Sequence, residues 1–288
     1  MLETWLTPGN QQQSPRDREC SETNNLTNHE RINVFGGIVL RKDVRSMILS
    51  LILGDGCLSQ TRPSKTGKTY GILAIQHGEK QRDYLEWKIE LVNKLLNRSM
   101  TAQNHKKGPA LWTTHRRLKA WRKFCYPNGK KDITRILPFI TNPTMALAIW
   151  MMDDGYVEPS IDKKNNKLYS VASRIFTCST PVVDQEKVII WLKENFDVTP
   201  SIKFQKRGKN HYNKTGDDYP FLRFTTGDSL KIWELIRDFV LQFDSMKHKF
   251  RYIEALYQVR VIKRTARSVD LDDIVHTFGN RDGITKDK

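Results

Sequence analysis

Two aspartates, Asp55 and Asp154, stand at the ends of two similar apolar runs, and each is followed by glycine. The runs, residues 48–56 and 147–155, each predict a buried helix. The C-terminal end of a helix carries partial negative charge, so an aspartate there is disfavoured unless a cation or a functional demand compensates. One Asp-Gly is typical of a turn after a helix. Two such endings favour a pair of carboxylates with a role in chemistry.

Further similarity follows each run in the same order, which predicts an internal duplication. After the first run come Trp112-Thr113-Thr114 and, three residues later, Leu118-Lys119-Ala120-Trp121. After the second come Phe224-Thr225-Thr226 and, at the same spacing, Leu230-Lys231-Ile232-Trp233. We therefore expect two related halves, each with one of the aspartates.

Charge and composition narrow the function classes. The 288 residues include 48 Lys+Arg and 32 Asp+Glu, a net charge of +16 with a pI near 9.7. This favours a polyanionic partner, although a membrane surface would also satisfy it. No apolar run approaches the roughly 20 residues that span a bilayer, and no signal-peptide pattern is seen. Four widely separated cysteines predict neither a zinc site nor a disulfide framework, so a reducing, intracellular setting is expected.

Composition also divides the chain into segments. We expect a polar, disordered N-terminal segment (1–34), a first half (35–140), a second half (141–262) and a polar C-terminal tail (263–288). In the tail, the spacing of Leu271, Ile274, Val275 and Phe278 predicts one short helix.

Each half is predicted to run helix, two strands, helix, two strands, helix, which makes the fold class α+β. In the first half the expected order is a helix to Asp55, a basic loop at 59–68, a strand at 70–77, a helix at 84–96, a hairpin turning at 106–109, a strand at 111–114 and a helix carrying Leu118 and Trp121. In the second half it is a helix to Asp154, a loop at 158–167, a strand at 171–178, a helix at 183–195, a hairpin at 201–226 and a helix at 230–243.

Basic and polar residues gather in the loops and strands of both halves, which is typical of a surface that contacts nucleic acid. The candidate DNA-binding residues are Arg62, Lys65, Lys68, Gln76, His77, Lys106, Lys107, Arg174, Lys203, Gln205, Lys206, Arg207 and Lys209. The two runs of positive charge in related positions favour two DNA half-sites over a merely solvated surface.

Over about residues 35–262 the chain resembles the LAGLIDADG homing endonucleases of the single-chain, two-motif type. The endings Gly54-Asp55-Gly56 and Asp153-Asp154-Gly155 carry the resemblance, and the closing stretch 246–250 adds to it. It implies a pseudo-twofold duplicated fold of two αββαββα halves, with the motif helices side by side and their acids meeting at one end. Two curved antiparallel sheets are then expected to form a DNA-binding saddle that reads bases in the major groove.

The resemblance also implies the catalytic machinery. Phosphodiester cleavage needs charge neutralised at the phosphate and an activated water, which divalent cations held by carboxylates and carbonyls provide. Asp55 and Asp154 are the expected catalytic metal ligands, with Gly54 and Asp153 as further ligands and Mg²⁺ as the cofactor, for which Mn²⁺ can substitute. One catalytic lysine per half is expected as well, and by position these are Lys131 and Lys249.

Two points stay open at this stage. Lys130 and Lys247 are alternatives for the two lysines. The halves are also unequal, because Ser50 and Gly54 of the first motif correspond to bulkier residues in the second, so an asymmetric target is expected.

The leading interpretation is a monomeric, Mg²⁺-dependent, site-specific DNA endonuclease that promotes insertion of its own reading frame. An RNA maturase that assists group I intron splicing is the alternative, and a non-cleaving DNA-binding regulator is a third. The expected compartment is an organelle such as the mitochondrion if the frame is intron-encoded, and otherwise a phage or microbial cytoplasm. No membrane partner is expected.

Overall fold

The structure is a computed structural model that describes residues 41–63, 65–106, 108–177, 180–205, 219–264 and 267–278. The expected N-terminal segment 1–34 lies outside these residues, as do four of the predicted DNA-binding residues, Lys107, Lys206, Arg207 and Lys209. Within the described ranges, no helix has the length and apolar character needed to cross a membrane.

The first half begins with the helix of the first motif, and its four strands form an antiparallel sheet in the order β1-β2-β4-β3. Helix α3 connects the two hairpins, and α4 follows the second. The elements are α2 (Arg41–Leu53), β1 (Cys57–Gln60), β2 (Gly71–Gln76), η2 (Glu79–Gln81), α3 (Arg82–Leu96), β3 (Gln103–His105), β4 (Gly108–His115), α4 (Arg116–Cys125), α5 (Ile133–Ile136) and η3 (Leu137–Phe139).

The second half repeats this order with a sheet β5-β6-β8-β7, and a short strand, β9, pairs with β6. Asn142 caps the N-terminus of the second motif helix, where its side chain accepts the Met145 N–H. The elements are α6 (Pro143–Asp154), β5 (Gly155–Asp162), β6 (Lys167–Phe176), α7 (Val182–Phe196), β7 (Ser201–Gln205), β8 (Tyr219–Arg223), α8 (Thr226–Val240), α9 (Asp244–Tyr257), the π-helical η4 (Gln258–Lys263), β9 (Val269–Asp270) and α10 (Leu271–Phe278).

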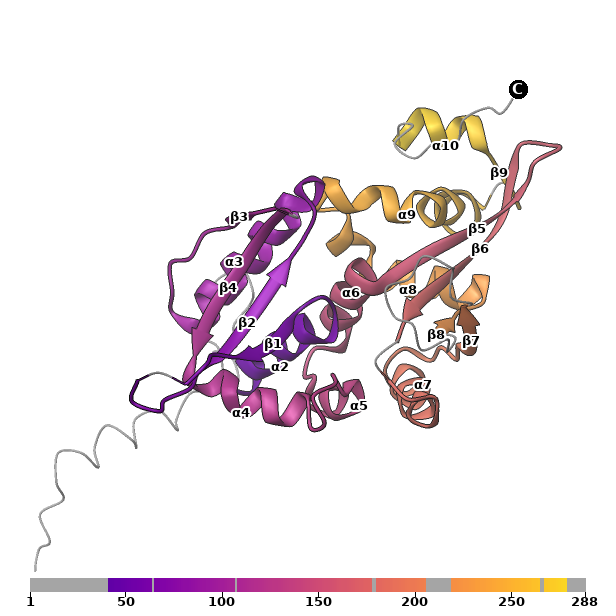
Figure 1. Cartoon of the computed structure of the whole chain (residues 1–288). Coiled ribbons are helices and arrows are strands. Elements are labelled where there is room, and N and C mark those ends of the chain that lie inside the picture. Colours follow the sequence, from indigo (N-terminus) through magenta and orange to yellow (C-terminus); the bar gives the residue numbers. More distant parts are fainter. Residues whose placement is uncertain are drawn as a thin grey trace, which may run out of the picture. The chain divides into compact units, whose positions relative to one another are not determined.

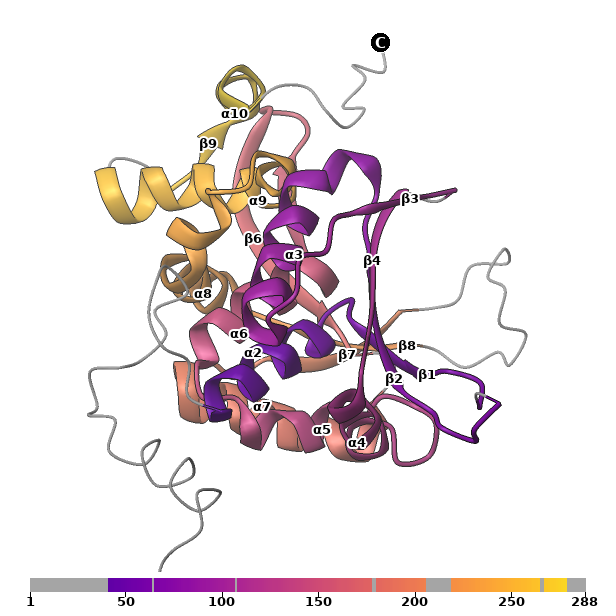
Figure 2. The ribbon, with the colours of Figure 1, turned by 90° about the vertical axis from the view of Figure 1, so that its left-hand side faces the viewer.

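Both halves therefore share the αββαββα order and the same sheet connectivity, which confirms the predicted α+β class and the duplication (Figure 1). In the first half, α3 lies on one side of β2 and β4 (Figure 2). The residues of β2 alternate between buried and partly exposed, as expected for a sheet with one covered face.

The repeat has a different register from the one read in the sequence. Ala110 pairs with the last residue of β2, and Phe221 pairs with the last residue of β6, so these two residues are equivalent. In this alignment Trp112 is equivalent to Arg223 rather than to Phe224, a shift of one residue. Trp112 is 49% exposed and Phe224 is fully buried. A slip of one residue in a strand moves a side chain to the opposite face, so the matched aromatics have different environments.

The prediction of a loop at 158–167 is wrong, because most of these residues form the long β5–β6 hairpin. Strand β5 continues to Asp162, whose side chain accepts the Lys164 and Asn165 N–H groups in the turn. Glu158 and Pro159 are residue types that are uncommon inside strands. Since β5 lies at the edge of its sheet, a proline and charged residues are tolerated there.

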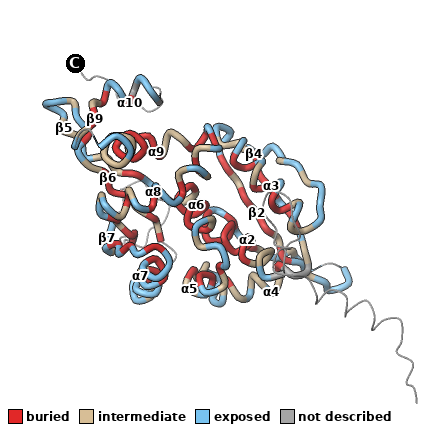
Figure 3. Tube along the Cα trace, turned by 180° about the vertical axis from the view of Figure 1, so that it is seen from behind, coloured by how far each residue is buried: buried red, intermediate tan, exposed pale blue. Residues whose placement is uncertain are grey.

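The motif helices α2 and α6 form the centre of the core. Residues 47–53 and 146–152 are all buried, and Figure 3 shows both segments as red tube. Near their N-terminal ends, Thr141 N donates to Ser46 Oγ at 2.8 Å, and near their C-terminal ends, Asp55 N donates to Asp153 Oδ2 at 2.9 Å. Contacts at both ends confirm that the two helices lie side by side in the same direction.

Helix α3 of the first half also contacts the second half through aromatic rings. Tyr84 meets Phe243 edge to face at a centroid distance of 5.1 Å, and Trp87 meets Phe239 at 5.1 Å. Such pairs add stability beyond the apolar area that they bury. They hold α3 against the second half close to the ends of the motif helices.

The C-terminal tail contains the short helix predicted there. Helix α10 packs on α9 and buries Leu271 and Ile274, while Val269 pairs with Leu168 of β6. The described part of the tail is thus attached to the second half.

Candidate functional site

The C-terminal ends of α2 and α6 meet at Gly54 and Asp153. A Cβ atom on Gly54 would lie 2.0 Å from Asp153 Oδ2, so only glycine permits this approach. The same carboxylate oxygen accepts the Asp55 N–H at 2.9 Å. The two acids predicted from the sequence, Asp55 and Asp154, follow directly at the paired ends. Of the two, Asp55 is exposed and Asp154 is partly buried.

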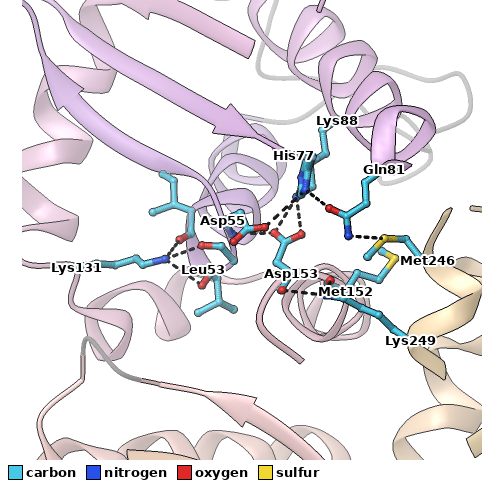
Figure 4. A network of polar contacts seen from close by, with 12 residues as sticks. Leu53, Asp55, His77, Gln81, Lys88, Lys131, Met152, Asp153, Met246 and Lys249 are labelled. Carbon is cyan, nitrogen blue, oxygen red and sulfur yellow. Dashed lines mark hydrogen bonds and ion pairs between the residues drawn. The ribbon is translucent and has the colours of Figure 1, made fainter. Parts of the chain in front are cut away.

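A buried lysine of α3, Lys88, neutralises Asp153 (Figure 4). Its Nζ donates to both carboxylate oxygens, at 2.7 and 2.8 Å, and to His77 Nε2 at 3.0 Å. His77 Nδ1 then donates to Gln81 Oε1 at 3.2 Å, a tautomer assigned from this network. Gln81 in turn donates to the Met246 sulfur. The chain of contacts joins His77, η2 and α3 to the second half.

Lys131 and Lys249 occupy corresponding places at the two helix ends. Lys131 Nζ donates to the Gly54 carbonyl at 2.6 Å and to the two carbonyls before it. Lys249 Nζ donates to the carbonyls of Met152 at 2.6 Å and Asp153 at 3.2 Å. A cation at a helix C-terminus satisfies its last carbonyls and offsets the negative end of the dipole. The site therefore holds one capping ammonium per half.

The alternative lysines lie elsewhere. Lys130 is exposed in the turn before Lys131. Lys247 forms an ion pair with Asp244 at the start of α9. Geometry thus brings Lys131 and Lys249, rather than their neighbours, to the helix ends.

The acids differ in protonation behaviour. Burial raises the pKa of Asp154 to about 7, with Lys131 opposing and the Asp55 charge adding to the rise. Although the Asp55 side chain is 38% exposed, the protein atoms packed around its carboxylate, together with the Asp153 charge, also raise the pKa of Asp55. Asp153 is more deeply buried, yet Lys88 holds its pKa below the usual value. Asp55 and Asp154 therefore lie where a bound cation would favour their ionised forms.

His77 is neutral at physiological pH. Burial and the neighbouring Lys88 charge lower its pKa to about 4. One ligand atom each from Asp55, His77 and Asp153 lies within 4.8 Å of the others. However, the Lys88 ammonium already binds both the His77 and the Asp153 side chains. The carboxylates left for a metal are those of Asp55 and Asp154. The carbonyls of Gly54 and Asp153 each accept from a lysine, Lys131 or Lys249, so each could offer a metal only its second lone pair.

The open face of the first sheet, the one not covered by α3, presents polar and aromatic side chains. Gln76 lies there, with its Nε2 3.5 Å from His105 Nδ1, and Trp112 pairs with Ala74 beside it. His77, the next residue after Gln76, points the other way and is 4% exposed. The loops that edge this sheet carry the exposed predicted residues Arg62, Lys65, Lys68 and Lys106.

The second sheet presents charged side chains at its centre. Arg174 and Arg223 are paired across β6 and β8, and both bind the Glu158 carboxylate. The Arg174 guanidinium also lies 4.8 Å from the centre of the Phe221 ring. The predicted residues Lys203 and Gln205 are exposed on the neighbouring β7. The two open faces therefore differ in chemistry, although their strands correspond.

Comparison with known proteins identifies the family. Residues 45–230, more than half of the chain, match the model of the LAGLIDADG DNA endonuclease family. The chain belongs to this family.

Two solved LAGLIDADG structures share the fold. The I-LtrWI LAGLIDADG homing endonuclease bound to target DNA has 11% identity and a TM-score of 0.51, covering 84% of this chain and 98% of that one. The LAGLIDADG homing endonuclease I-GzeII in complex with its DNA target has 8% identity and a TM-score of 0.52, covering 84% and 99%. These likenesses confirm the duplicated fold expected from the motifs.

Curated relatives of this LAGLIDADG chain include proteins named RecA. The protein from Mycolicibacterium chitae is 26% identical over 234 residues, which cover 80% of this chain and 51% of the relative. The one from Mycolicibacterium flavescens is 27% identical over 205 residues, which cover 70% and 45%. The chain spans about half the length of the curated relatives it matches.

Sequence reasoning missed Lys88, Glu158 and Arg223. The sequence does contain a sign of the role of Lys88, because this lysine falls on the apolar face of its helix, with Tyr84, Leu85, Ile89 and Val92. A lysine on a buried face needs a partner that neutralises its charge. Glu158 falls in the loop expected at 158–167. For Arg223, the sequence alone did not fix the strand register that places it beside Arg174.

Proposed function

We propose that this chain is a homing endonuclease that hydrolyses both strands of a long, asymmetric DNA target with Mg²⁺ as cofactor. The observation that carries the proposal is the meeting of the two motif helices at their C-terminal ends, where Asp55 and Asp154 follow and where Lys131 caps one helix and Lys249 the other. Double-strand cleavage requires two centres, and the duplicated fold supplies one acid and one lysine for each.

The donor set fits a divalent cation. Mg²⁺ prefers oxygen ligands, and the helix ends offer the carboxylates of Asp55 and Asp154 with the carbonyls of Gly54 and Asp153. The raised pKa values of the two acids fit as well, because such carboxylates gain most from a nearby positive charge. When bound, Mg²⁺ would neutralise charge at the scissile phosphate and lower the pKa of a water.

The protein's own residues do the positioning. Lys131 and Lys249 fix the last carbonyls of the motif helices and bring positive charge to the place where the phosphate would lie. Gly54 allows the C-terminal ends of α2 and α6 to meet, which brings the two reaction centres close together. Backbone and lysine contacts thus set the distance between the two reaction centres before DNA arrives.

The sheets supply the recognition surface in this proposal. Their open faces carry side chains that pair with base edges, such as Gln76, Arg174 and Lys203, and the loops add lysines and arginines for phosphates. Gln76 and Trp112 on one sheet and the Arg174–Arg223 pair on the other would contact different bases. We therefore expect an asymmetric target and binding that weakens steeply with salt.

The test incubates the protein and Mg²⁺ with DNA from the organism that carries the gene, in a form whose insertion site lacks the gene. The ends of the cleaved DNA are then mapped by sequencing. The wild-type chain is compared with Asp154→Asn and with Asp238→Asn, the same change at an acid whose side chain is 94% exposed on α8. We expect a unique double-strand break from wild type and Asp238→Asn, and none from Asp154→Asn.

Other outcomes have distinct meanings. Cleavage by Asp154→Asn at the wild-type rate would remove Asp154 from the site. Salt-sensitive binding without cleavage by wild type would contradict the nuclease proposal. A filter-binding and splicing assay with group I intron RNA would then decide whether the chain acts on RNA.

A further inference from the structure

Among the described residues, the charged cluster around Lys88 occurs in only one half. Helices α3 and α7 are equivalent, and Lys88 of α3 corresponds to Val188 of α7, which is fully buried. His77, which follows β2, corresponds to Thr177, which follows β6. The partner of Lys88 is equally unsymmetrical, since Asp153 of the second motif corresponds to glycine in the first. The two expected reaction centres therefore have different supports.

Lys88 acts on the Asp55 centre through Asp153. Its ammonium binds both Asp153 oxygens, and one of them, Oδ2, accepts the Asp55 N–H. That hydrogen bond and the contact with Gly54 fix the peptide group between residues 54 and 55. From Lys88 to the Asp55 backbone there are two direct contacts and no exposed side chain.

The surroundings leave Lys88 little freedom. Its side chain is fully buried, its Nζ lies 4.3 Å from the centre of the Tyr84 ring, and Tyr84 itself packs against Phe243. A charge in such a place persists only with a matched partner. The ammonium also takes the place between Asp153 and His77 where a bound cation could otherwise draw the Asp153 carboxylate away from Asp55.

We propose that Lys88 is a positioning residue for one of the two cleavage centres: it anchors Asp153, which fixes the backbone of Asp55. The proposal rests on the endonuclease function proposed above. Loss of Lys88 would release Asp153, either to rotate away from the Asp55 N–H or to compete with Asp55 for the metal. The Asp154 centre has no such contact with Lys88, so the two strands of the target would respond unequally.

The experiment measures single-turnover cleavage of each strand separately, with differently labelled ends, under saturating protein. Lys88→Met is compared with Val188→Ala, which perturbs the core at the equivalent position of the second half without removing a charge. DNA binding is measured in Ca²⁺. We expect Lys88→Met to bind normally and to cut one strand at least about tenfold more slowly than the other, so that nicked DNA accumulates. We expect Val188→Ala to show no such difference between strands.

Equal slowing of both strands by Lys88→Met, or no slowing, would overturn the proposal. A second measurement does not need nuclease activity: hydrogen exchange of the Asp55 amide in folded protein. We expect protection in wild type and in Val188→Ala and at least about tenfold faster exchange in Lys88→Met. Unchanged protection would refute the positioning role. Failure of the wild-type chain to cut any DNA would instead count against the proposed function, and the amide measurement would still decide the role of Lys88.

Discussion

The buried ion pair between Lys88 and Asp153 is expected to make the stability of the chain highly sensitive to the loss of either partner. Both side chains are fully buried and form two hydrogen bonds of 2.7 and 2.8 Å. Lys88→Met leaves an uncompensated carboxylate in the core, and Asp153→Asn leaves an uncompensated ammonium. Removing one partner of such a pair costs about 3–5 kcal/mol. For a chain of this size that lowers Tm by about 6–20 °C.

The double variant separates the pair from the residues themselves. With both charges removed, no buried charge is left unpaired, so the double variant should lose no more than either single variant. The coupling energy would then be at least about 3 kcal/mol. Lys187→Met is the matched control, because it removes a lysine from an exposed ion pair with Asp184, and such pairs contribute about 1 kcal/mol or less.

The assay is urea unfolding followed by circular dichroism at pH 7 and at pH 3. The folded-state pKa of Asp153 is lowered, so the pair's contribution is present above the unfolded-state pKa and is lost as pH falls through the folded-state pKa. The gap between wild type and Lys88→Met should therefore narrow at pH 3. Single-variant losses that simply add in the double variant would refute the reasoning.

Three further results are expected. Burial raises the pKa of Asp154 to about 7, so without metal the folded wild-type chain loses stability as pH rises from about 4 through 7 and the buried carboxyl ionises. Asp154→Asn cannot ionise, and it should therefore be more stable than wild type by about 2–4 kcal/mol at pH 8 in EDTA. Urea unfolding should show little difference between the two at pH 4. Gly54→Ala should lower the free energy of unfolding by about 1–3 kcal/mol, because its Cβ would lie 2.0 Å from the Asp153 Oδ2 atom, which Lys88 holds in place. Gly78→Ala is the control, since a Cβ there meets nothing within 4 Å, and equal thermal shifts of the two variants would contradict the packing argument. Glu158→Gln should release the Arg174 guanidinium, raise the affinity for non-target DNA and make that affinity fall more steeply with salt. A fluorescence titration that gives the same slope of log affinity against log salt as wild type would count against this arginine as a DNA contact.

Much of the fold followed from the sequence because the repeated motifs fixed two buried helices and the order of the elements around them. The acids at the helix ends were predictable for the same reason. The support of the site was not, because the contact between Lys88 and Asp153 joins residues 65 positions apart in different halves. Nor did the sequence reveal the strand register, so the pairing of Arg174 with Arg223 and Glu158 depended on the observed ladder.

The single-copy ion pair bears on the ancestry of the chain. In a homodimer of the first half, each Lys88 would face glycine at the position of Asp153, and two ammonium groups would be buried without partners. In a homodimer of the second half, each Asp153 would face valine, and the two carboxylates would collide where Gly54 now lies. Once this pair arose, the halves could no longer revert to identical subunits. Chimeric enzymes that exchange one half with a relative must therefore transfer Lys88 and Asp153 together, or replace both.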